Sequence, residues 1–216
     1  MQDVVIVAAT RTAIGAFQGA LANVSATELG STVIRALLEN TGIDPAMVDE
    51  VIMGQVLTAG CGQNPARQSA INAGLPHSVP AMTVNKLCGS GLKTVHLATQ
   101  AIRCGDAEIV IAGGMENMSN APYLLERARQ GYRLGHGGVV KDHMFLDGLE
   151  DAYDQGKLMG CFAEDTARKY QFTRDAQDEF AIESLNRAKK AIEDGTFKDE
   201  IEPVVVKTRK GEAVIE

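Results

Sequence analysis

Cys88 is the residue of this sequence whose surroundings best suit covalent chemistry. It lies in residues 85–95 (NKLCGSGLKTV), where the turn Gly89, Ser90 and Gly91 separates two apolar runs. Glycine permits backbone conformations that a Cβ forbids, so we expect a sharp turn that exposes the sulfur at the start of a helix. A helix N-terminus favours an anion, and the thiolate is the nucleophilic form of cysteine. Cys88 is therefore a candidate nucleophile; the alternative is a buried structural cysteine.

The segments on either side of this turn predict the elements that position Cys88. Residues 79–84 are mostly apolar and β-branched, which indicates a strand. After the turn, apolar residues recur at helical spacing from Leu92 to Ile102, and Gly105 ends the predicted helix. The expected unit is a strand, a sharp turn and a helix.

Further apolar runs predict strands at residues 4–9, 51–53 and 108–112, and the first run suits a strand covered on both faces. Helices alternate with these strands. This alternation predicts an α/β fold with a mostly parallel sheet, in which ligands gather at the carboxyl ends of the strands. Cys88 and the glycine pair at 113–114 both follow predicted strand ends.

Cap signals delimit three more helices, the first of them with a capping box and the second with a proline at its first position. The first of these helices is expected between Ser25 and Gly42, the second between Asn64 and Gly74, and the third between Thr173 and Gly195.

The second half of the chain begins with a long irregular segment. Residues 120–160 are rich in Gly, Asp, His and Met and contain no long strand pattern; such segments are more often functional than idle. Residues 201–207 and 213–215 indicate two strands joined by a turn at 210–211. Because the chain stops within this hairpin, we expect the sequence to be part of a longer one.

The four histidines are candidates to activate the thiol, because a Cys-His pair is a common way to form a thiolate. His96 lies two helical turns beyond Cys88, on the order of 12 Å along the helix axis, which is too far for a base. We expect His77, His136 and His143 to be solvated, since they lie on polar, glycine-rich segments. Neither the histidines nor the four cysteines show the spacing of a metal site.

Composition excludes several other classes of protein. A net charge of -7 over 216 residues argues against a nucleic-acid surface, and no run approaches the roughly 20 apolar residues of a membrane span. The cysteines have no disulfide-framework spacing, and no targeting segment is evident, so a cytoplasmic location is expected.

Five segments together resemble the thiolase family, and in particular its biosynthetic acetyl-CoA acetyltransferases. NKLCGSGLK at 85–93 is similar to the acyl-accepting cysteine motif of that family. The other four follow in the expected order and extend the resemblance over essentially the whole chain. They are VVIVAATRTAIG (4–15), EVIMGQVLTAGCGQNPARQ (50–68), AGGMENMS (112–119) and TRDAQDEF (173–180).

The resemblance implies a thiolase-like layered fold. Residues 1–118 would form the amino-terminal core half, and residues 119–216 an incomplete loop domain that covers the active site and helps to assemble a homotetramer. Family members are much longer than this chain. Their second half supplies an activating histidine and a second cysteine that acts as acid and base, so the chain alone is expected to be inactive.

The resemblance also implies a reaction, in which Cys88 takes an acyl group from acyl-CoA as a new thioester. Two acetyl-CoA molecules would condense to acetoacetyl-CoA and CoA, or the reverse thiolysis would occur. The CoA thioester is then the substrate, and no separate cofactor is expected. The backbone N–H of Cys88, with the turn formed by Gly89, Ser90 and Gly91, would stabilise the oxyanion.

Five other residues are candidate site residues. Asn85, Glu116 and Asn117 either orient the catalytic loop or satisfy the backbone of the turns. Leu158 and Met159 match the wall of the family's acyl pocket. Many members have a histidine where this chain has Leu158, so a polar contact to the acyl group is expected to be lost.

Two alternatives stay open beside this interpretation. A ketoacyl synthase shares the doubled fold and a cysteine at the same kind of turn, although GQNPARQ, NKLCGSG and GGMENMS favour a thiolase. The second alternative is a catalytically incomplete fragment that acts only as an assembly or binding module.

Overall fold

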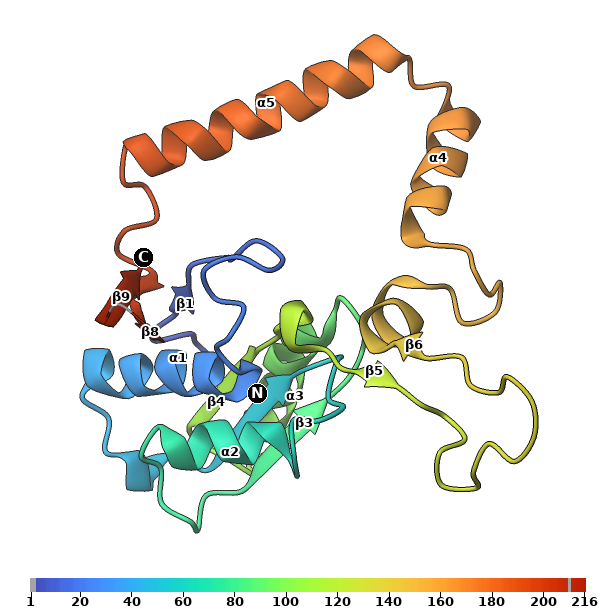
Figure 1. Cartoon of the computed structure of the whole chain (residues 1–216). Helices are drawn as coiled ribbons and strands as arrows, with labels where there is room; N and C mark the ends of the chain where they lie inside the picture. Colours follow the sequence, from blue (N-terminus) through green and yellow to red (C-terminus); the bar gives the residue numbers. More distant parts are fainter. Residues whose placement is uncertain (1–2, 210) are drawn as a thin grey trace.

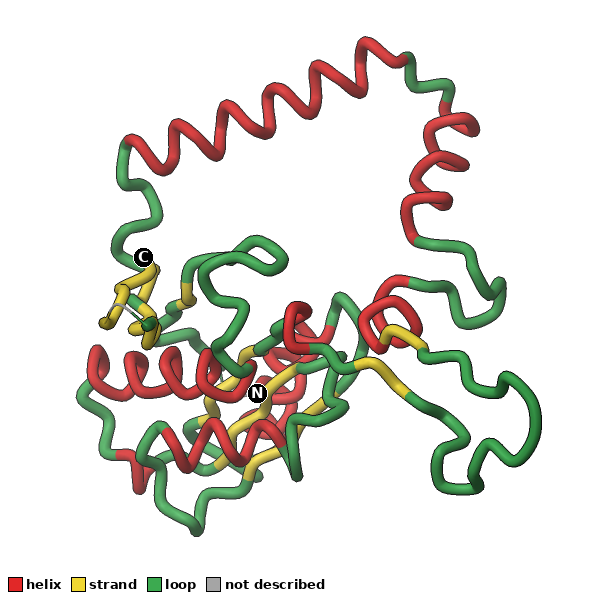
Figure 2. The backbone as a smooth tube through the Cα atoms, viewed as in Figure 1, coloured by secondary structure: helices red, strands yellow, loops and turns green. Residues whose placement is uncertain are grey.

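The computed structural model describes residues 3–209 and 211–216, and a parallel sheet lies at its centre (Figures 1 and 2). The strand order in this sheet is β3-β2-β4, and both pairings are parallel, which confirms the predicted mostly parallel sheet. Gly54 pairs with Val84 on one side and with Gly114 on the other, so the three carboxyl ends meet at one edge. The bounds are Glu50–Gly54 for β2, Ala81–Val84 for β3 and Val110–Gly114 for β4.

Helices cover both faces of this sheet. α1 (Ala26–Thr41) and α2 (Pro65–Asn72) pack on one face, where Ile34, Val51 and Ala66 are fully buried in the main hydrophobic core. α3 (Ser90–Cys104) lies on the other face, behind the sheet in Figure 1. The chain thus builds the three-layer arrangement that alternating strands and helices predict.

Local signals explain where these helices begin and end. Ser25 Oγ accepts a hydrogen bond from the Glu28 N–H, and the Glu28 carboxylate accepts one from the Ser25 N–H, so the predicted capping box is present. Gly42 ends α1 at a φ of 66°, and Gly105 ends α3 at 79°, both in the left-handed region that glycine adopts without strain.

Residues 4–9 do not form the strand that their apolar run predicts. Val5, Ile6 and Val7 are 73%, 77% and 73% exposed, and the first strand, β1, comprises only Arg11–Thr12. An apolar cavity of about 280 Å³ lies between this segment and β4. A strand must lie close enough to a neighbouring backbone to form hydrogen bonds with it, and here the cavity separates residues 4–9 from β4.

The irregular segment contains only short elements, as its composition predicts. β5 pairs with β6 in an antiparallel ladder, and a five-residue π-helix follows. α4 was not predicted, because its N-cap, Leu158, provides no capping side chain. The bounds are Tyr123–Leu124 for β5, Lys141–Asp142 for β6, Phe145–Leu149 for the π-helix and Met159–Tyr170 for α4.

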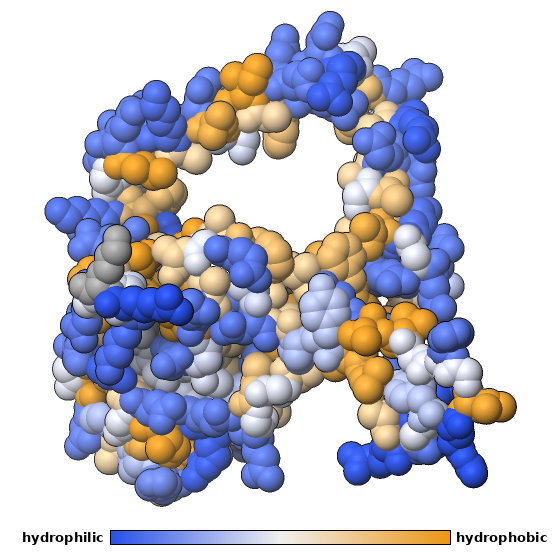
Figure 3. Space-filling model, viewed as in Figure 1, coloured by the Kyte–Doolittle hydropathy of each residue, from blue (hydrophilic) through white to orange (hydrophobic). Residues whose placement is uncertain are grey.

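α4 and α5 (Arg174–Glu193) form an arch that leaves the sheet and returns to it (Figure 1). The predicted apolar face of α5 is present but is exposed, as Figure 3 shows for the arch; Phe180 and Ile192 are 78% and 79% accessible. No helix among the described residues is both long and apolar enough to span a membrane.

The last strands return to the first part of the chain. β7 (Ile201–Glu202) pairs in parallel with β1, and β8 (Val204–Thr208) forms the expected antiparallel hairpin with β9 (Gly211–Ile215). Lys210, in the predicted turn, is outside the described residues. Val204 packs against Leu21 and Val24, so this hairpin contacts the segment that leads into α1. The division at residue 118 stays a prediction.

Candidate active site

Cys88 lies in the turn between β3 and α3 and is exposed, as its position predicts. It opens into a cavity of about 430 Å³ at the edge where the strands end. Four separate parts of the chain supply the walls of this cavity, which we call the Cys88 cavity. Its lining includes Gly54, Leu57, Leu87, Cys88, Met118 and Leu149.

The shape of the cysteine turn comes from Leu87 and Ser90. Leu87 adopts a φ of 49°, in the left-handed region, whereas Gly89 has an ordinary φ of -93°. Ser90 Oγ accepts a hydrogen bond from the Lys86 N–H at 2.8 Å and donates one to the Leu87 carbonyl at 2.6 Å. The expectation that the glycines provide unusual backbone angles here was wrong, because Leu87 takes the strained position and the serine hydroxyl holds it.

α3 is fixed against the sheet at the cysteine end. A Cβ built on Gly54 would lie 2.7 Å from the Ser90 Cβ, so β2 and the start of α3 are in backbone contact. Thr94 is fully buried and donates a hydrogen bond to the Gly113 carbonyl at 3.1 Å. Gly89 is the N-cap of α3 and has no side chain to cap it. The N-terminal end of α3, with its backbone N–H groups, therefore adjoins the cysteine turn without a side-chain cap.

Glu116 lines the Cys88 cavity, and its carboxylate holds the loop after β2. It accepts hydrogen bonds from the Val56 N–H at 2.8 Å and from the Leu57 N–H at 3.1 Å. Burial raises the pKa of Glu116 above its ordinary value, although these two hydrogen bonds lower it. The side chain is therefore placed to orient the loop that walls the cavity.

Asn85 and Asn117 lie near the strand ends but do not line the Cys88 cavity. Asn85 Oδ1 accepts a hydrogen bond from the Leu87 N–H at 2.9 Å, within the cysteine turn. Asn117 Nδ2 donates to the carbonyls of Leu21, Ala22 and Val24, and its Oδ1 accepts from the Ser119 N–H. Both amides therefore satisfy backbone groups.

Leu158 and Met159 are 36% and 46% exposed and mark the start of α4. Neither lies among the residues that line the Cys88 cavity. Their assignment to an acyl pocket stays a prediction, while Leu57, Met118 and Leu149 provide the apolar lining that is present.

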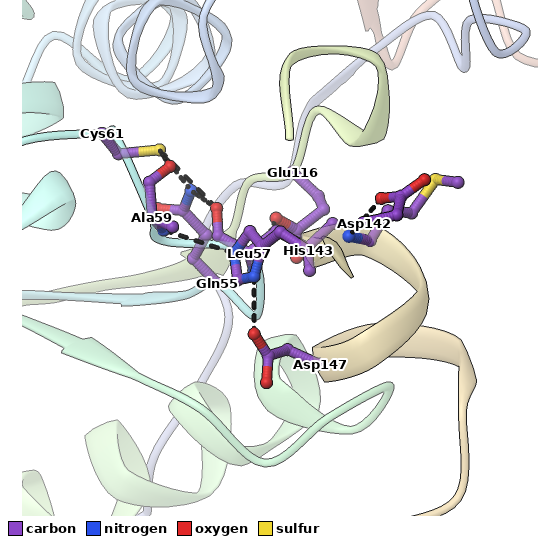
Figure 4. A network of polar contacts seen from close by, with 9 residues as sticks. Gln55, Leu57, Ala59, Cys61, Glu116, Asp142, His143 and Asp147 are labelled. Carbon is purple, nitrogen blue, oxygen red and sulfur yellow. Dashed lines mark hydrogen bonds and ion pairs between the residues drawn. The ribbon is translucent and has the colours of Figure 1, made fainter. Parts of the chain in front are cut away.

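His143 is not solvated, which corrects one expectation. It is 5% exposed, with Nδ1 2.6 Å from Asp147 Oδ2 and Nε2 accepting a hydrogen bond from the Ala59 N–H at 3.3 Å (Figure 4). One of these two partners, Ala59, lies 84 positions earlier in the sequence, which local composition does not reveal. The pairing of His and Asp four residues apart was the available signal. His77 and His136 are exposed, as expected.

Gln55 is a second buried polar residue in this region that the sequence did not single out. Its Nε2 donates to the Leu57 carbonyl at 3.0 Å and contacts Cys61 Sγ at 3.3 Å (Figure 4), while Oε1 is buried without a partner among the described residues. No group of three His, Cys, Asp or Glu side chains in the described part of the chain is placed to hold a metal ion. The site as built is an exposed thiol in a mostly apolar cavity, which suits covalent capture of an electrophile.

Comparison with known families gives one match that covers nearly the whole chain. The family model described as "Thiolase, N-terminal domain" matches residues 4–216.

Curated proteins give the same result. The chain is 63% identical over 212 residues to the acetyl-CoA acetyltransferase of Pseudomonas aeruginosa, covering 98% of this chain and 53% of that protein. It is 49% identical over 215 residues to the probable acetyl-CoA acyltransferase of Staphylococcus aureus, covering all of this chain and 54% of that protein. The chain spans about half the length of the curated relatives it matches.

A solved structure agrees as well. The crystal structure of the Bacillus anthracis acetyl-CoA acetyltransferase superposes with a TM-score of 0.92 at 41% sequence identity, over 98% of this chain and 53% of that one.

Proposed function

This chain belongs to the thiolase family and has its fold, and from that premise we propose that it carries the acyl-accepting half of an acetyl-CoA acetyltransferase site, with Cys88 as the nucleophile. The observation that carries the proposal is the position of Cys88. It is an exposed thiol at the amide end of α3 that opens into an apolar cavity of about 430 Å³. Relatives named acetyl-CoA acetyltransferase support the reaction class.

In the proposed reaction, the Cys88 thiolate attacks the carbonyl carbon of acetyl-CoA. A bond forms between Cys88 Sγ and the acyl carbon, the bond from that carbon to the CoA sulfur breaks, and CoA leaves as a thiolate that takes up a proton. A second acetyl-CoA then loses a methyl proton to a base, and its carbanion attacks the acyl carbon held by Cys88. A carbon–carbon bond forms, the bond from that carbon to Cys88 Sγ breaks, acetoacetyl-CoA is released and Cys88 is left as a thiolate. Thiolysis runs the same steps in reverse.

Three features of the chain support the first step. The amide end of α3 favours the negative charge that develops at the carbonyl oxygen, and the backbone N–H of Cys88 is a proposed donor to it. Leu57, Met118 and Leu149 provide an apolar surface for the acyl group beside Cys88. Glu116 holds the loop that contains Leu57 in place.

The test is intact-mass spectrometry of the protein as its gene encodes it, before and after incubation with acetyl-CoA, followed by peptide mapping. We expect one added acetyl group, located on Cys88 and lost in Cys88→Ala. Cys104→Ala is the matched control, because Cys104 is an exposed cysteine at the opposite end of the same helix.

A folded protein that gains no acetyl group would contradict the proposal. It would favour the alternative, a module that serves only in assembly or binding. Light scattering of the same sample tests the homotetramer that we also propose.

A further inference from the structure

Two of the four parts of the chain that wall the Cys88 cavity lie far apart in the sequence. Leu57 lies in the loop after β2, and Gly148 and Leu149 end the π-helix. A Cβ built on Gly148 would lie 3.4 Å from Leu57 Cδ2, so a single added methyl group would bridge the two walls. Whatever holds these two segments together therefore determines the width of the cavity.

His143 makes contact with both segments (Figure 4). Its Nε2 accepts a hydrogen bond from the Ala59 N–H at 3.3 Å, two residues beyond Leu57. Its Nδ1 lies 2.6 Å from Asp147 Oδ2, directly before Gly148. The side chain is 5% exposed, so water does not replace either contact at low cost.

These two contacts define the protonation of the imidazole. A backbone N–H can only donate, so Nε2 of His143 carries no proton when it accepts from Ala59. The proton of the neutral ring is then on Nδ1 and is donated to the Asp147 carboxylate. Asp147 thus selects the tautomer whose free nitrogen anchors the Ala59 loop.

Glu116 completes the anchoring of the same loop. Its carboxylate accepts from the Val56 and Leu57 N–H groups, and His143 accepts from that of Ala59. Glu116 lines the Cys88 cavity, whereas His143 does not. His143 can therefore affect the reaction only through the residues that it holds.

Resting on the proposed acyl transfer, we propose that His143 is a positioning residue that sets the width of the Cys88 cavity and thereby its discrimination between short and longer acyl groups. Without the Ala59 contact, Glu116 still holds the Val56 and Leu57 N–H groups, but the loop loses its anchor beyond Leu57, so Leu57 can move away from Gly148 and the cavity widens. Each methylene in an apolar pocket changes discrimination by a factor of roughly 10 to 200, so a modest widening has a measurable effect.

Two near-isosteric variants separate the two contacts of His143. In His143→Gln the side-chain carbonyl reaches the position of Nε2 and can accept from Ala59. In His143→Asn the shorter amide reaches the position of Nδ1 and can donate to Asp147, but it leaves the Ala59 N–H without its acceptor. His143→Ala removes both contacts.

The first readout is the ratio of Cys88 acylation rates with acetyl-CoA and with butyryl-CoA, measured by mass spectrometry on the protein as its gene encodes it. This ratio is independent of how much of each variant is folded. We expect it to stay within about twofold of wild type in His143→Gln and to fall at least roughly fivefold in His143→Asn and His143→Ala, as a wider pocket rejects the longer chain less. An equal ratio in all four proteins would overturn the proposal.

The second readout is hydrogen exchange of the Ala59 amide, which requires no catalysis. We expect faster exchange in His143→Asn and His143→Ala than in wild type and His143→Gln. Unchanged exchange in all variants would overturn the anchoring role. A wild-type protein that gains no acyl group would instead contradict the proposed function, and the exchange result would still decide whether His143 anchors the loop.

Discussion

Gly54 and Ser90 are in such close backbone contact that a Cβ on Gly54 would lie 2.7 Å from both the Cβ and the carbonyl carbon of Ser90. Gly54 is the last residue of β2, and Ser90 is the first residue of α3. This contact brings the start of α3, and with it Cys88, to the edge of the sheet. The position of the nucleophile thus depends on a missing side chain in a different element.

Gly54→Ala should therefore displace the cysteine turn. The added methyl group meets backbone atoms rather than a flexible side chain, and overpacking of this kind costs about 1–3 kcal/mol. We expect a loss of that size in the free energy of unfolding, measured by denaturant titration, together with slower acetylation of Cys88.

Gly91→Ala is the stability control for this variant, since a Cβ on Gly91 meets nothing within 4 Å. Alanine is favoured over glycine in helices by up to about 1 kcal/mol, so stability should be unchanged or higher. If Gly54→Ala unfolded at the same denaturant concentration as wild type, the tight contact would not exist in solution.

Glu116→Gln should change the pH dependence of stability. Burial raises the pKa of Glu116 in the folded state above its ordinary value of 4.5, so the folded protein holds this proton more tightly than the unfolded chain does. The resulting stabilisation is fully present below pH 4.5 and is lost as the pH rises to the raised folded value. Wild type should therefore lose stability relative to Glu116→Gln across that window.

The measurement is the free energy of unfolding of both proteins at a series of pH values from about 4 to 8. The quantity to compare is how the difference in unfolding free energy between the two proteins changes with pH. The amide also alters the hydrogen bonds to Val56 and Leu57, but that effect is the same at every pH. A difference that grew in favour of wild type with increasing pH would mean that the folded state prefers the carboxylate.

Asn117→Ala should destabilise the fold. The variant leaves the Ala22 carbonyl without its donor and the Ser119 N–H without its acceptor, and it removes one of the two donors to each of the carbonyls of Leu21 and Val24. Unsatisfied buried groups cost about 1–3 kcal/mol, which thermal or chemical unfolding detects. Asn120→Ala is the milder control, because the Asn120 side chain donates a single hydrogen bond within the described part of the chain, to the Val24 carbonyl. Equal losses in the two variants would rule out a special role for Asn117.

Ser25→Ala should remove the capping box of α1. The hydroxyl caps the Glu28 N–H, and loss of such a cap costs about 0.5–2 kcal/mol. Ser25→Asp should retain most of the stability, since aspartate is an equally good N-cap. Helix content and unfolding midpoints from circular dichroism check both variants, and an unaffected Ser25→Ala would show that α1 is held by packing alone.

Local patterns predicted those parts of the fold that are stabilised locally. The capping box at Ser25, the proline after Asn64 and the apolar runs of β2 and β4 each contain their own signal, and the corresponding elements are present. Residues 4–9 carry an equally strong strand pattern but lack a neighbouring backbone, because pairing depends on the rest of the molecule.

The candidate site shows the same limit. Cys88 could be predicted as the candidate nucleophile from the sequence, because the cysteine, the glycines of the turn and the start of the helix are adjacent in the chain. Its distance to other residues was not predictable, because the cavity walls at Leu57 and Leu149 belong to segments that meet only in three dimensions. The exposure of His143 was predicted wrongly for the same reason. Its polar sequence neighbours indicated a solvated side chain, whereas the loop at Ala59 covers it.

The pairing of β1 with β7 has a consequence for the order of folding. Thr10 and Glu200, joined by a hydrogen bond at the start of this ladder, are 190 positions apart, whereas all pairings of the central sheet lie within residues 50–114. Closing a longer loop costs more chain entropy, and the two-residue ladder repays little of it. The central sheet should therefore form first, and the α4–α5 arch should close last and open first under mild denaturation.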